Sequence, residues 1–161
     1  MDNFNNKIAV VTGGGTGMGR ELVLQLANEG CNVSMCDVIE ENMQETFDKA
    51  TEQFPDVKIT KHICDVSNEN DVIRFKDEVI AQQETDYVNL LFNNAGIGGG
   101  GSFIHSSREE WDRVFAVCWH GVYYCSRAFM PYILASEEAH IINTSSINGF
   151  WASLGGTPHT S

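Results

Sequence analysis

The fold is decided near the start of the chain by the stretch Ile8-Ala9-Val10-Val11-Thr12-Gly13-Gly14-Gly15-Thr16-Gly17-Met18-Gly19-Arg20. Its first four residues are apolar without alternation, which is typical of a buried strand in a parallel sheet. The glycines that follow permit a sharp turn and a close approach to the main chain. A helical apolar pattern comes next, made of Met18, Leu22, Val23, Leu26 and Ala27. The stretch predicts a strand, a turn and a helix whose N-terminus can bind an anion, usually a pyrophosphate.

Length and composition limit the class of protein. The chain has 161 residues, of which 42% are hydrophobic and 20% charged, as in one globular domain. Its net charge of −12 argues against binding to nucleic acid or to an anionic membrane surface. Neither a signal peptide nor a membrane-spanning apolar run is recognisable, so we expect a cytoplasmic protein with no membrane partner. The five cysteines form no CxxC pair, and we interpret them as buried, reduced thiols.

Strand and helix patterns alternate from end to end. Further strands are expected at residues 31–37, 57–64, 87–93 and 140–146, and helices at 40–54, from a cap within 67–71 through Ile80, and at 108–134. Ser106 or Ser107, with Glu109 or Glu110 three residues on, predicts a capping box at the last helix. Pro131 is expected to bend or shorten the end of that helix. The alternation predicts right-handed βαβ units, in an open parallel sheet with helices on both faces.

Unusual residues follow each predicted strand, at the edge of the sheet where ligands bind in such folds. These are the glycine turn, Asp37, Asp65-Val66, Asn93-Asn94-Ala95-Gly96 and Ser145-Ser146. Asp37 comes 18 positions after Gly19, close to the spacing of about 20 for an acid that binds the adenine-ribose hydroxyls of NAD. A carboxylate there repels the 2′-phosphate of NADP, and no basic residue follows at once. The spacing favours NAD as the cofactor; the alternative is an ordinary turn acid.

The glycine spacing is Thr12-Gly13-x-x-x-Gly17-x-Gly19, and the commoner G-x-G-x-x-G fits at no register. Together with Asn93-Asn94-Ala95-Gly96 and Ser145-Ser146, this pattern resembles the short-chain dehydrogenase/reductase family over nearly the whole chain. The resemblance implies an α/β fold of Rossmann type, with a doubly wound parallel sheet. It also implies an NAD-dependent oxidoreductase that transfers a hydride between the cofactor and a secondary alcohol or ketone, as a homotetramer or homodimer.

The resemblance further implies roles for individual residues. The cofactor would be bound by Gly13, Gly15, Thr16, Gly17, Met18, Gly19, Asp37, Asp65, Val66, Asn94, Ala95 and Gly96. Ser146 corresponds to the catalytic serine that hydrogen-bonds the substrate oxygen, and Ser145 is the alternative. Asp65 could instead cap the following helix, and Asn93 could tie two strands together. No metal site is predicted.

The sequence departs from the family pattern in two places. No Tyr-x-x-x-Lys pair follows Ser146, although the family uses its phenol to move the proton and its lysine to lower the phenol pKa. We therefore expect residues 1–161 to be a single dinucleotide-binding domain, incomplete at its C-terminus, of a longer enzyme. The alternative is a non-catalytic NAD-binding sensor or scaffold. Cys118 stands where the family usually has an asparagine that supports a water relay, and we interpret it as a packed core thiol.

Overall fold

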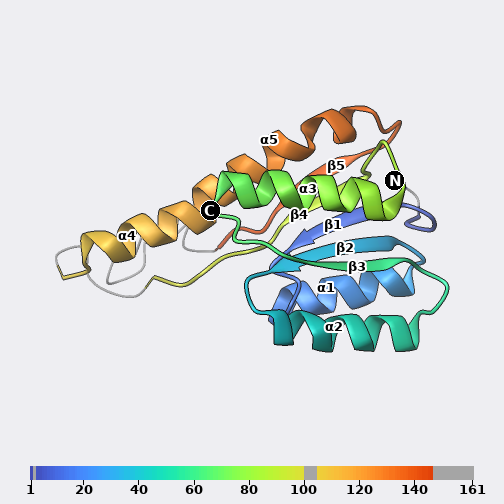
Figure 1. Ribbon diagram of the computed structural model, residues 1–161, viewed down its shortest axis with the longest axis horizontal. Helices are drawn as coiled ribbons and strands as arrows, with labels where there is room; N and C mark the ends of the chain where they lie inside the picture. The colour runs from blue at the N-terminus through green and yellow to red at the C-terminus, as the bar shows by residue number, and fades with distance from the viewer. Residues whose placement is uncertain (2, 100–104, 147–161) are drawn as a thin grey trace.

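The computed structural model describes residues 1, 3–99 and 105–146 (Figure 1). Its centre is a five-stranded sheet in the order β3-β2-β1-β4-β5, and every neighbouring pair of strands is parallel. The strands are β1 (Ile8–Thr12), β2 (Asn32–Asp37), β3 (Ile59–Ile63), β4 (Leu90–Asn93) and β5 (His140–Asn143). The predicted α/β, doubly wound parallel architecture is confirmed.

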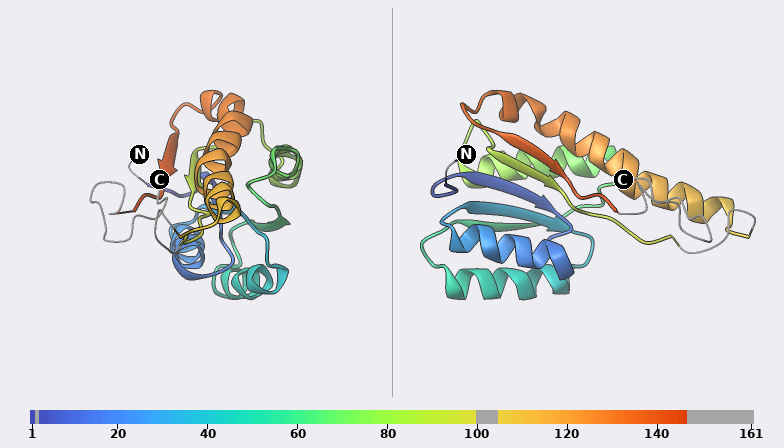
Figure 2. Two further views of the ribbon diagram at one scale, coloured as in Figure 1. Left: turned by 90° about the vertical axis from the view of Figure 1, so that its left-hand side faces the viewer. Right: turned by 180° about the vertical axis from the view of Figure 1, so that it is seen from behind.

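Helices cover both faces of the sheet. Figures 1 and 2 show α1 (Gly17–Asn28) and α2 (Glu40–Gln53) on one face, and α3 (Glu69–Gln83) and α5 (Gly121–Leu134) on the other. The chain runs outward from β1 to β3 and then returns to place β4 on the other side of β1. The strand order thus reverses between β1 and β4, and a reversal of this kind opens a crevice at the carboxyl ends of the strands.

Both faces of β1 are buried, which explains its unbroken apolar sequence. Val10 packs in a core cluster with residues of α3 and α5, whereas Ala9 and Val11 pack in a second cluster with residues of α1. All five residues of the strand are buried. A central strand of a parallel sheet needs apolar side chains on both faces, so its sequence does not alternate between apolar and polar residues.

The inner face of α1 differs from the prediction at one position. Met18 was predicted to face the core, but its side chain is 63% exposed. Gly19 takes the buried position instead, and Val23, Leu26 and Ala27 follow it on that face. The helix ends where expected, because Gly30 adopts a φ of +78°, which suits glycine at the end of a helix.

The long helix predicted over residues 108–134 is present but is not α-helical throughout. It consists of α4 (Arg108–Phe115), a π-helical segment over Ala116–His120, and α5. Ser107 is its N-cap and accepts a hydrogen bond from the Glu110 amide at 3.1 Å, as the capping-box prediction requires. The helix runs on to Leu134, so Pro131 does not shorten it. Across the described ranges, no helix is long and apolar enough to cross a membrane.

A chain of buried polar side chains lies between the sheet and α3. The Thr60 hydroxyl donates to Ser34 Oγ at 2.7 Å, and Gln83 Nε2 donates to the same oxygen at 2.9 Å. His62 continues the chain, with Nε2 2.9 Å from Thr60 Oγ1 and Nδ1 2.9 Å from Glu78 Oε2. Burial lowers the pKa of His62, and the effect outweighs the opposing influence of Glu78.

We predict that His62 makes folding sensitive to acid. Because its pKa is lower in the folded state, the unfolded chain binds this proton more readily. The neutral imidazole thus contributes stability that is present above the ordinary pKa of 6.5 and is lost as the pH falls through the lowered folded-state pKa. Urea unfolding between about pH 7 and pH 5 should show a steeper loss for the wild type than for His62→Gln. His140→Gln, at an exposed position, serves as the control, and equal slopes in wild type and His62→Gln would contradict the prediction.

Candidate functional site

The glycine turn between β1 and α1 lies at the carboxyl edge of the sheet and leaves no room for a side chain at Gly13 or Gly19. Gly13 has a φ of +67° and Gly17 a φ of +53°, values that other residues rarely adopt. A Cβ atom on Gly13 would lie 2.9 Å from Ala95 Cα, and one on Gly19 would lie 2.0 Å from the Gly13 carbonyl oxygen. The turn therefore packs directly against the loop that follows β4 and against the start of its own helix.

The N-terminus of α1 is open to a ligand. Thr16 is the N-cap, but its side chain makes no capping hydrogen bond, and the first turn contains no acidic residue. Thr16, Gly17 and Met18 are all exposed. The positive end of the helix dipole is thus neither capped nor neutralised by these side chains, which suits the binding of an anion.

Asp37 lies beside this turn, at the end of β2. Its Oδ2 accepts a hydrogen bond from the Gly15 amide at 3.1 Å. Its Oδ1 accepts from the amides of Val38, at 2.8 Å, and Ile39, at 3.2 Å. Three main-chain donors fix the carboxylate in place, and the side chain remains partly exposed. The structure therefore brings the predicted acid and the glycine turn together.

The loop after β4 is tied to the end of β1 by one hydroxyl. Thr12 Oγ1 accepts hydrogen bonds from the amides of Asn94, at 3.0 Å, and Ala95, at 2.9 Å. A second hydrogen bond joins the same two residues, because Asn94 Nδ2 donates to the Thr12 carbonyl at 3.0 Å. Asn93 joins β4 to β5 through Asn143 Oδ1 at 2.8 Å, as its predicted alternative role requires. Our sequence reasoning gave Thr12 no role, although its place directly before Gly13 was a usable signal.

A cavity of about 150 Å³ lies between this loop, β5 and the long helix. Its lining residues are Asn93, Asn94, Ala95, Gly96, Ile97, Cys118, Val122, Thr144, Ser145 and Ser146. Ser146, predicted as the catalytic serine, thus shares a cavity with Asn94, Ala95 and Gly96. Asn93 Oδ1 is buried and has no hydrogen-bond partner among the described residues.

Cys118 lines this cavity rather than the core. Its side chain is only half-buried, and its Sγ donates to the Ile97 carbonyl at 3.6 Å. It lies within the π-helical segment, and segments of this kind are frequent at functional sites. The prediction of a packed core thiol is therefore wrong for Cys118, because the wider helical turn places this residue against the loop after β4.

The other cysteines fit the prediction of buried, free thiols. These are Cys31, Cys36, Cys64 and Cys125. Burial raises the pKa of Cys31 and of Cys125 to about 12, so both remain protonated near neutral pH. Among the described residues, no group of histidine, cysteine and acidic side chains is arranged to bind a metal ion.

Asp65 and Val66 follow β3 at the same edge of the sheet. Asp65 is exposed, and its Oδ1 accepts hydrogen bonds from the amide and hydroxyl of Ser67 at 2.9 and 2.7 Å. The cap of α3 is Asn68, so the alternative role of Asp65 as that cap is wrong. Val66 is buried, and a Cβ atom on Gly121 would lie 2.8 Å from its side chain.

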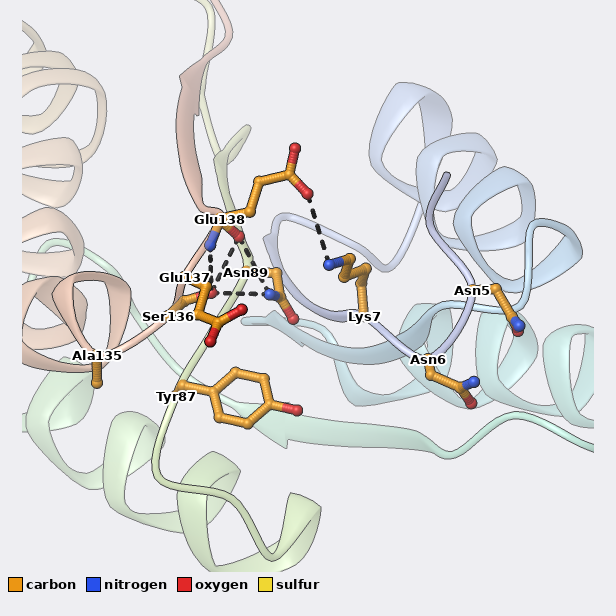
Figure 3. Close-up of a pocket in the computed structure, with 9 residues that line it drawn as sticks. All are labelled: Asn5, Asn6, Lys7, Tyr87, Asn89, Ala135, Ser136, Glu137 and Glu138. Atoms are coloured by element: carbon orange, nitrogen blue, oxygen red, sulfur yellow. Dashed lines mark hydrogen bonds and ion pairs between the residues drawn. The ribbon is translucent and has the colours of Figure 1, made fainter. Parts of the chain in front are cut away.

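A larger pocket, of about 460 Å³, lies near the amino ends of β1 and β4 (Figure 3). Several of its polar side chains bind one another. Asn89 Nδ2 donates to Ser136 Oγ at 2.9 Å and to the Glu138 carbonyl at 3.2 Å, and its Oδ1 accepts from the Ile8 amide. Lys7 Nζ lies 3.6 Å from Glu138 Oε2. Parallel sheets bind ligands at their opposite edge, and we therefore assign the functional site to the carboxyl ends of the strands.

Comparison with known proteins identifies the family. Residues 7–161 match the family model described as short chain dehydrogenase. The chain belongs to the short-chain dehydrogenase family. It is 36% identical over 155 residues to the uncharacterized oxidoreductase YxbG of Bacillus subtilis, covering 96% of this chain and 55% of that one. It is 31% identical over 152 residues to meso-2,3-butanediol dehydrogenase of Serratia marcescens, covering 94% and 58% respectively. The chain thus spans somewhat more than half the length of these relatives.

Solved structures of short-chain dehydrogenases share the fold and differ in cofactor. An enzyme from Burkholderia phymatum in complex with NAD has a TM-score of 0.89 and 35% identity, covering 96% of this chain and 54% of that one. A metagenomic short-chain oxidoreductase in complex with NADP has a TM-score of 0.80 and 30% identity, covering 89% and 63%. A nicotinamide cofactor, NAD or NADP, is therefore typical of the family to which this chain belongs.

We predict that the turn tolerates no side chain at Gly19. In Gly19→Ala, the added methyl group would collide with the Gly13 carbonyl, so the turn must move. We expect a loss of about 1–3 kcal/mol in the free energy of unfolding, measured with urea. Gly98→Ala is the matched control, because a Cβ atom there meets nothing within 4 Å. A loss at Gly19→Ala no larger than that of the control would contradict the described packing.

Proposed function

We propose that the protein binds NAD along the carboxyl edge of its sheet. We further propose that the full-length protein transfers a hydride between NAD and a secondary alcohol or ketone. The observation that carries this proposal is the position of Asp37, whose carboxylate is held beside the glycine turn by the Gly15 amide at 3.1 Å. An acid so placed can accept hydrogen bonds from both ribose hydroxyls, and its charge disfavours a 2′-phosphate.

We propose the remaining cofactor contacts on the basis of the family resemblance and of their place along the same edge. Gly13, Gly17 and Gly19 shape the turn, and the uncapped start of α1 offers its main-chain amides and positive dipole to the pyrophosphate. We assign the other contacts to Gly15, Thr16, Met18, Asp65, Val66, Asn94, Ala95 and Gly96. The buried side chain of Val66 leaves its main chain as the group that would face the adenine. The cofactor would supply the two-electron hydride chemistry.

Ser146 would orient the reacting oxygen of the substrate. It lines the 150 Å³ cavity beside the loop after β4, and a hydroxyl there can donate to a carbonyl or accept from an alcohol. The phenol of the family's Tyr-x-x-x-Lys pair would donate or accept the proton, and this pair has no counterpart after Ser146 in these 161 residues. Similarity to an enzyme named for a diol supports a small alcohol as substrate.

A non-catalytic NAD-binding sensor or scaffold is the second candidate. Cys118 favours it, because a thiol lines the cavity where the family pattern has a carboxamide. The two candidates share the cofactor and differ in whether the full-length protein turns over any alcohol.

We also propose that the protein forms a homodimer or homotetramer through its long helix. Trp119, Tyr123, Met130 and Leu134 are exposed by 58%, 51%, 37% and 76%. Their spacing of four, seven and four residues is that of one helical stripe, and an exposed apolar stripe is typical of an interface.

The acidic composition supports our expectation that neither nucleic acid nor a membrane is a partner. We also propose a cytoplasmic location, because the cysteines are free thiols, as is usual in intracellular proteins.

The ribose assignment predicts a change of cofactor preference in Asp37→Ala. Loss of two hydrogen bonds to a charged acceptor should raise the dissociation constant for NAD by about tenfold or more. Affinity for NADP should stay equal or improve, because the repelling charge is gone. Calorimetric titration of the full-length protein with both cofactors measures this, with Asp48→Ala as a control acid on α2. Unchanged affinities for both cofactors would contradict the assignment.

The serine assignment predicts a loss of turnover without a loss of cofactor. Ser146→Ala in the full-length protein should lower kcat by about 100-fold or more, because a donor to the reacting oxygen is removed. The dissociation constant for NAD should remain within about twofold, as expected for a group that contacts the substrate only. A panel of secondary alcohols with NAD gives the assay, and Ser145→Ala is the neighbouring control. If Ser145→Ala alone abolished turnover, the assignment to Ser146 would be wrong.

A further inference from the structure

Gly15 is held through both of its main-chain polar groups. Its amide donates to Asp37 Oδ2 at 3.1 Å. Its carbonyl accepts from Arg20 Nη2 at 2.8 Å, from Arg20 Nε at 3.2 Å and from Thr46 Oγ1 at 2.9 Å. The residue that fixes the Asp37 carboxylate is thus itself fixed by side chains from α1 and α2.

Arg20 is in turn held by an acid on α2. Its Nη1 and Nη2 atoms donate to Glu45 Oε1 and Oε2, both at 2.9 Å. The arginine side chain is 15% exposed. Because a guanidinium is planar and donates in fixed directions, this two-point contact sets the plane in which Arg20 meets the Gly15 carbonyl. The guanidinium is also occupied by these partners and is not offered to a phosphate.

Thr46 completes the contact between α2 and the turn. It is fully buried, and its hydroxyl accepts from Arg20 Nε at 2.9 Å. The hydroxyl lies within donating distance of the Gly15 carbonyl, at 2.9 Å, and of the Asn42 carbonyl, at 3.1 Å. A hydroxyl has one hydrogen to donate, so Arg20 Nη2 is the donor that the Gly15 carbonyl retains in either case.

The fit around Gly15 is tight as well as polar. A Cβ atom there would lie 2.9 Å from Asp37 Oδ2 and 3.1 Å from Asn42 Cβ. There is therefore no room for a side chain at Gly15, between the Asp37 carboxylate and α2. We use the name Gly15 clamp for Gly15 and the three residues that hold its carbonyl group directly or through Arg20, namely Arg20, Glu45 and Thr46.

We propose that Arg20 and Thr46 are positioning residues that set the discrimination between NAD and NADP. This rests on the proposed role of Asp37 in binding the ribose. The Gly15 clamp holds the Gly15 amide toward Asp37, and the amide holds the carboxylate toward the place of the ribose hydroxyls. The two residues act through Gly15 and Asp37 and need no contact of their own with the cofactor.

The test compares dissociation constants for NAD and NADP in Arg20→Met, Arg20→Lys and Thr46→Val of the full-length protein. We expect Arg20→Met to raise the constant for NAD by about tenfold, because charge-assisted hydrogen bonds are lost, and that for NADP by less than about threefold. The ratio of the NADP dissociation constant to the NAD dissociation constant should therefore fall. Thr46→Val, which is nearly isosteric, should lower this ratio as well. Arg20→Lys keeps the charge but loses the planar pair of donors, so its ratio should lie between those of Arg20→Met and the wild type.

Lys49→Met is the matched control. Lys49 is the other partner of Glu45, at 2.7 Å, and no contact joins it to Gly15 among the described residues. This variant should leave both dissociation constants unchanged. Circular dichroism and thermal unfolding of each variant would show that the fold is retained.

The possible outcomes separate this inference from the proposed function. An equal loss of affinity for both cofactors in Arg20→Met and Thr46→Val would indicate a purely structural role and overturn the inference. A changed ratio in Asp37→Ala but in neither of these variants would overturn the inference and leave the ribose assignment standing. An unchanged ratio in Asp37→Ala would overturn both. The inference is supported if the ratio of the NADP to the NAD dissociation constant falls in Asp37→Ala, Arg20→Met and Thr46→Val but not in Lys49→Met.

Discussion

The glycine turn and the start of α1 depend on one main-chain contact, the approach of α1 to the carbonyl of Gly13. A Cβ atom on Gly19 would lie 2.0 Å from that oxygen, so glycine is required there. The contact sets where α1 begins, and thereby where its positive end faces. Gly13 also lies against Ala95, in the loop that Thr12 Oγ1 holds beside the turn. The close approach of these segments thus requires glycine at two positions and a hydroxyl at a third.

A protein with a net charge of −12 can still offer an anion site, because the positive potential comes from its main chain. The uncapped start of α1 supplies it, while Arg20 is engaged by the Gly15 carbonyl and by Glu45. Asp37 is likewise held by three amides. Arg20 and Asp37, two charged groups beside the turn, are therefore both held in place by hydrogen bonds.

The sequence was sufficient to predict those strands, helices and turns that local periodicity or glycine determines. The five strands, their helices and the edge carrying Asp37, Asn94 and Ser146 could all be predicted, because parallel βαβ units align the ends of their strands. Met18 was misplaced because the close contact at Gly19, rather than hydrophobicity, sets the face of α1. Thr12 stands directly before Gly13, which was a usable signal, although its partner lies 82 residues away. The role of Thr46 depends on a partner 31 residues away, and no local pattern contains that contact.

The π-helical segment at Ala116–His120 can be regarded as a one-residue insertion that the helix has absorbed. Because the wider turn takes up the extra residue locally, removing that residue would restore an ordinary α-helical turn and leave the faces of α4 and α5 in nearly the same directions. The buried row on α5 would keep facing the sheet, whereas Cys118, inside the wider turn, would lose its place against the loop after β4. A deletion here would thus alter the cavity and spare the core. The extra residue in this helix therefore shapes the cavity rather than the packing of the sheet.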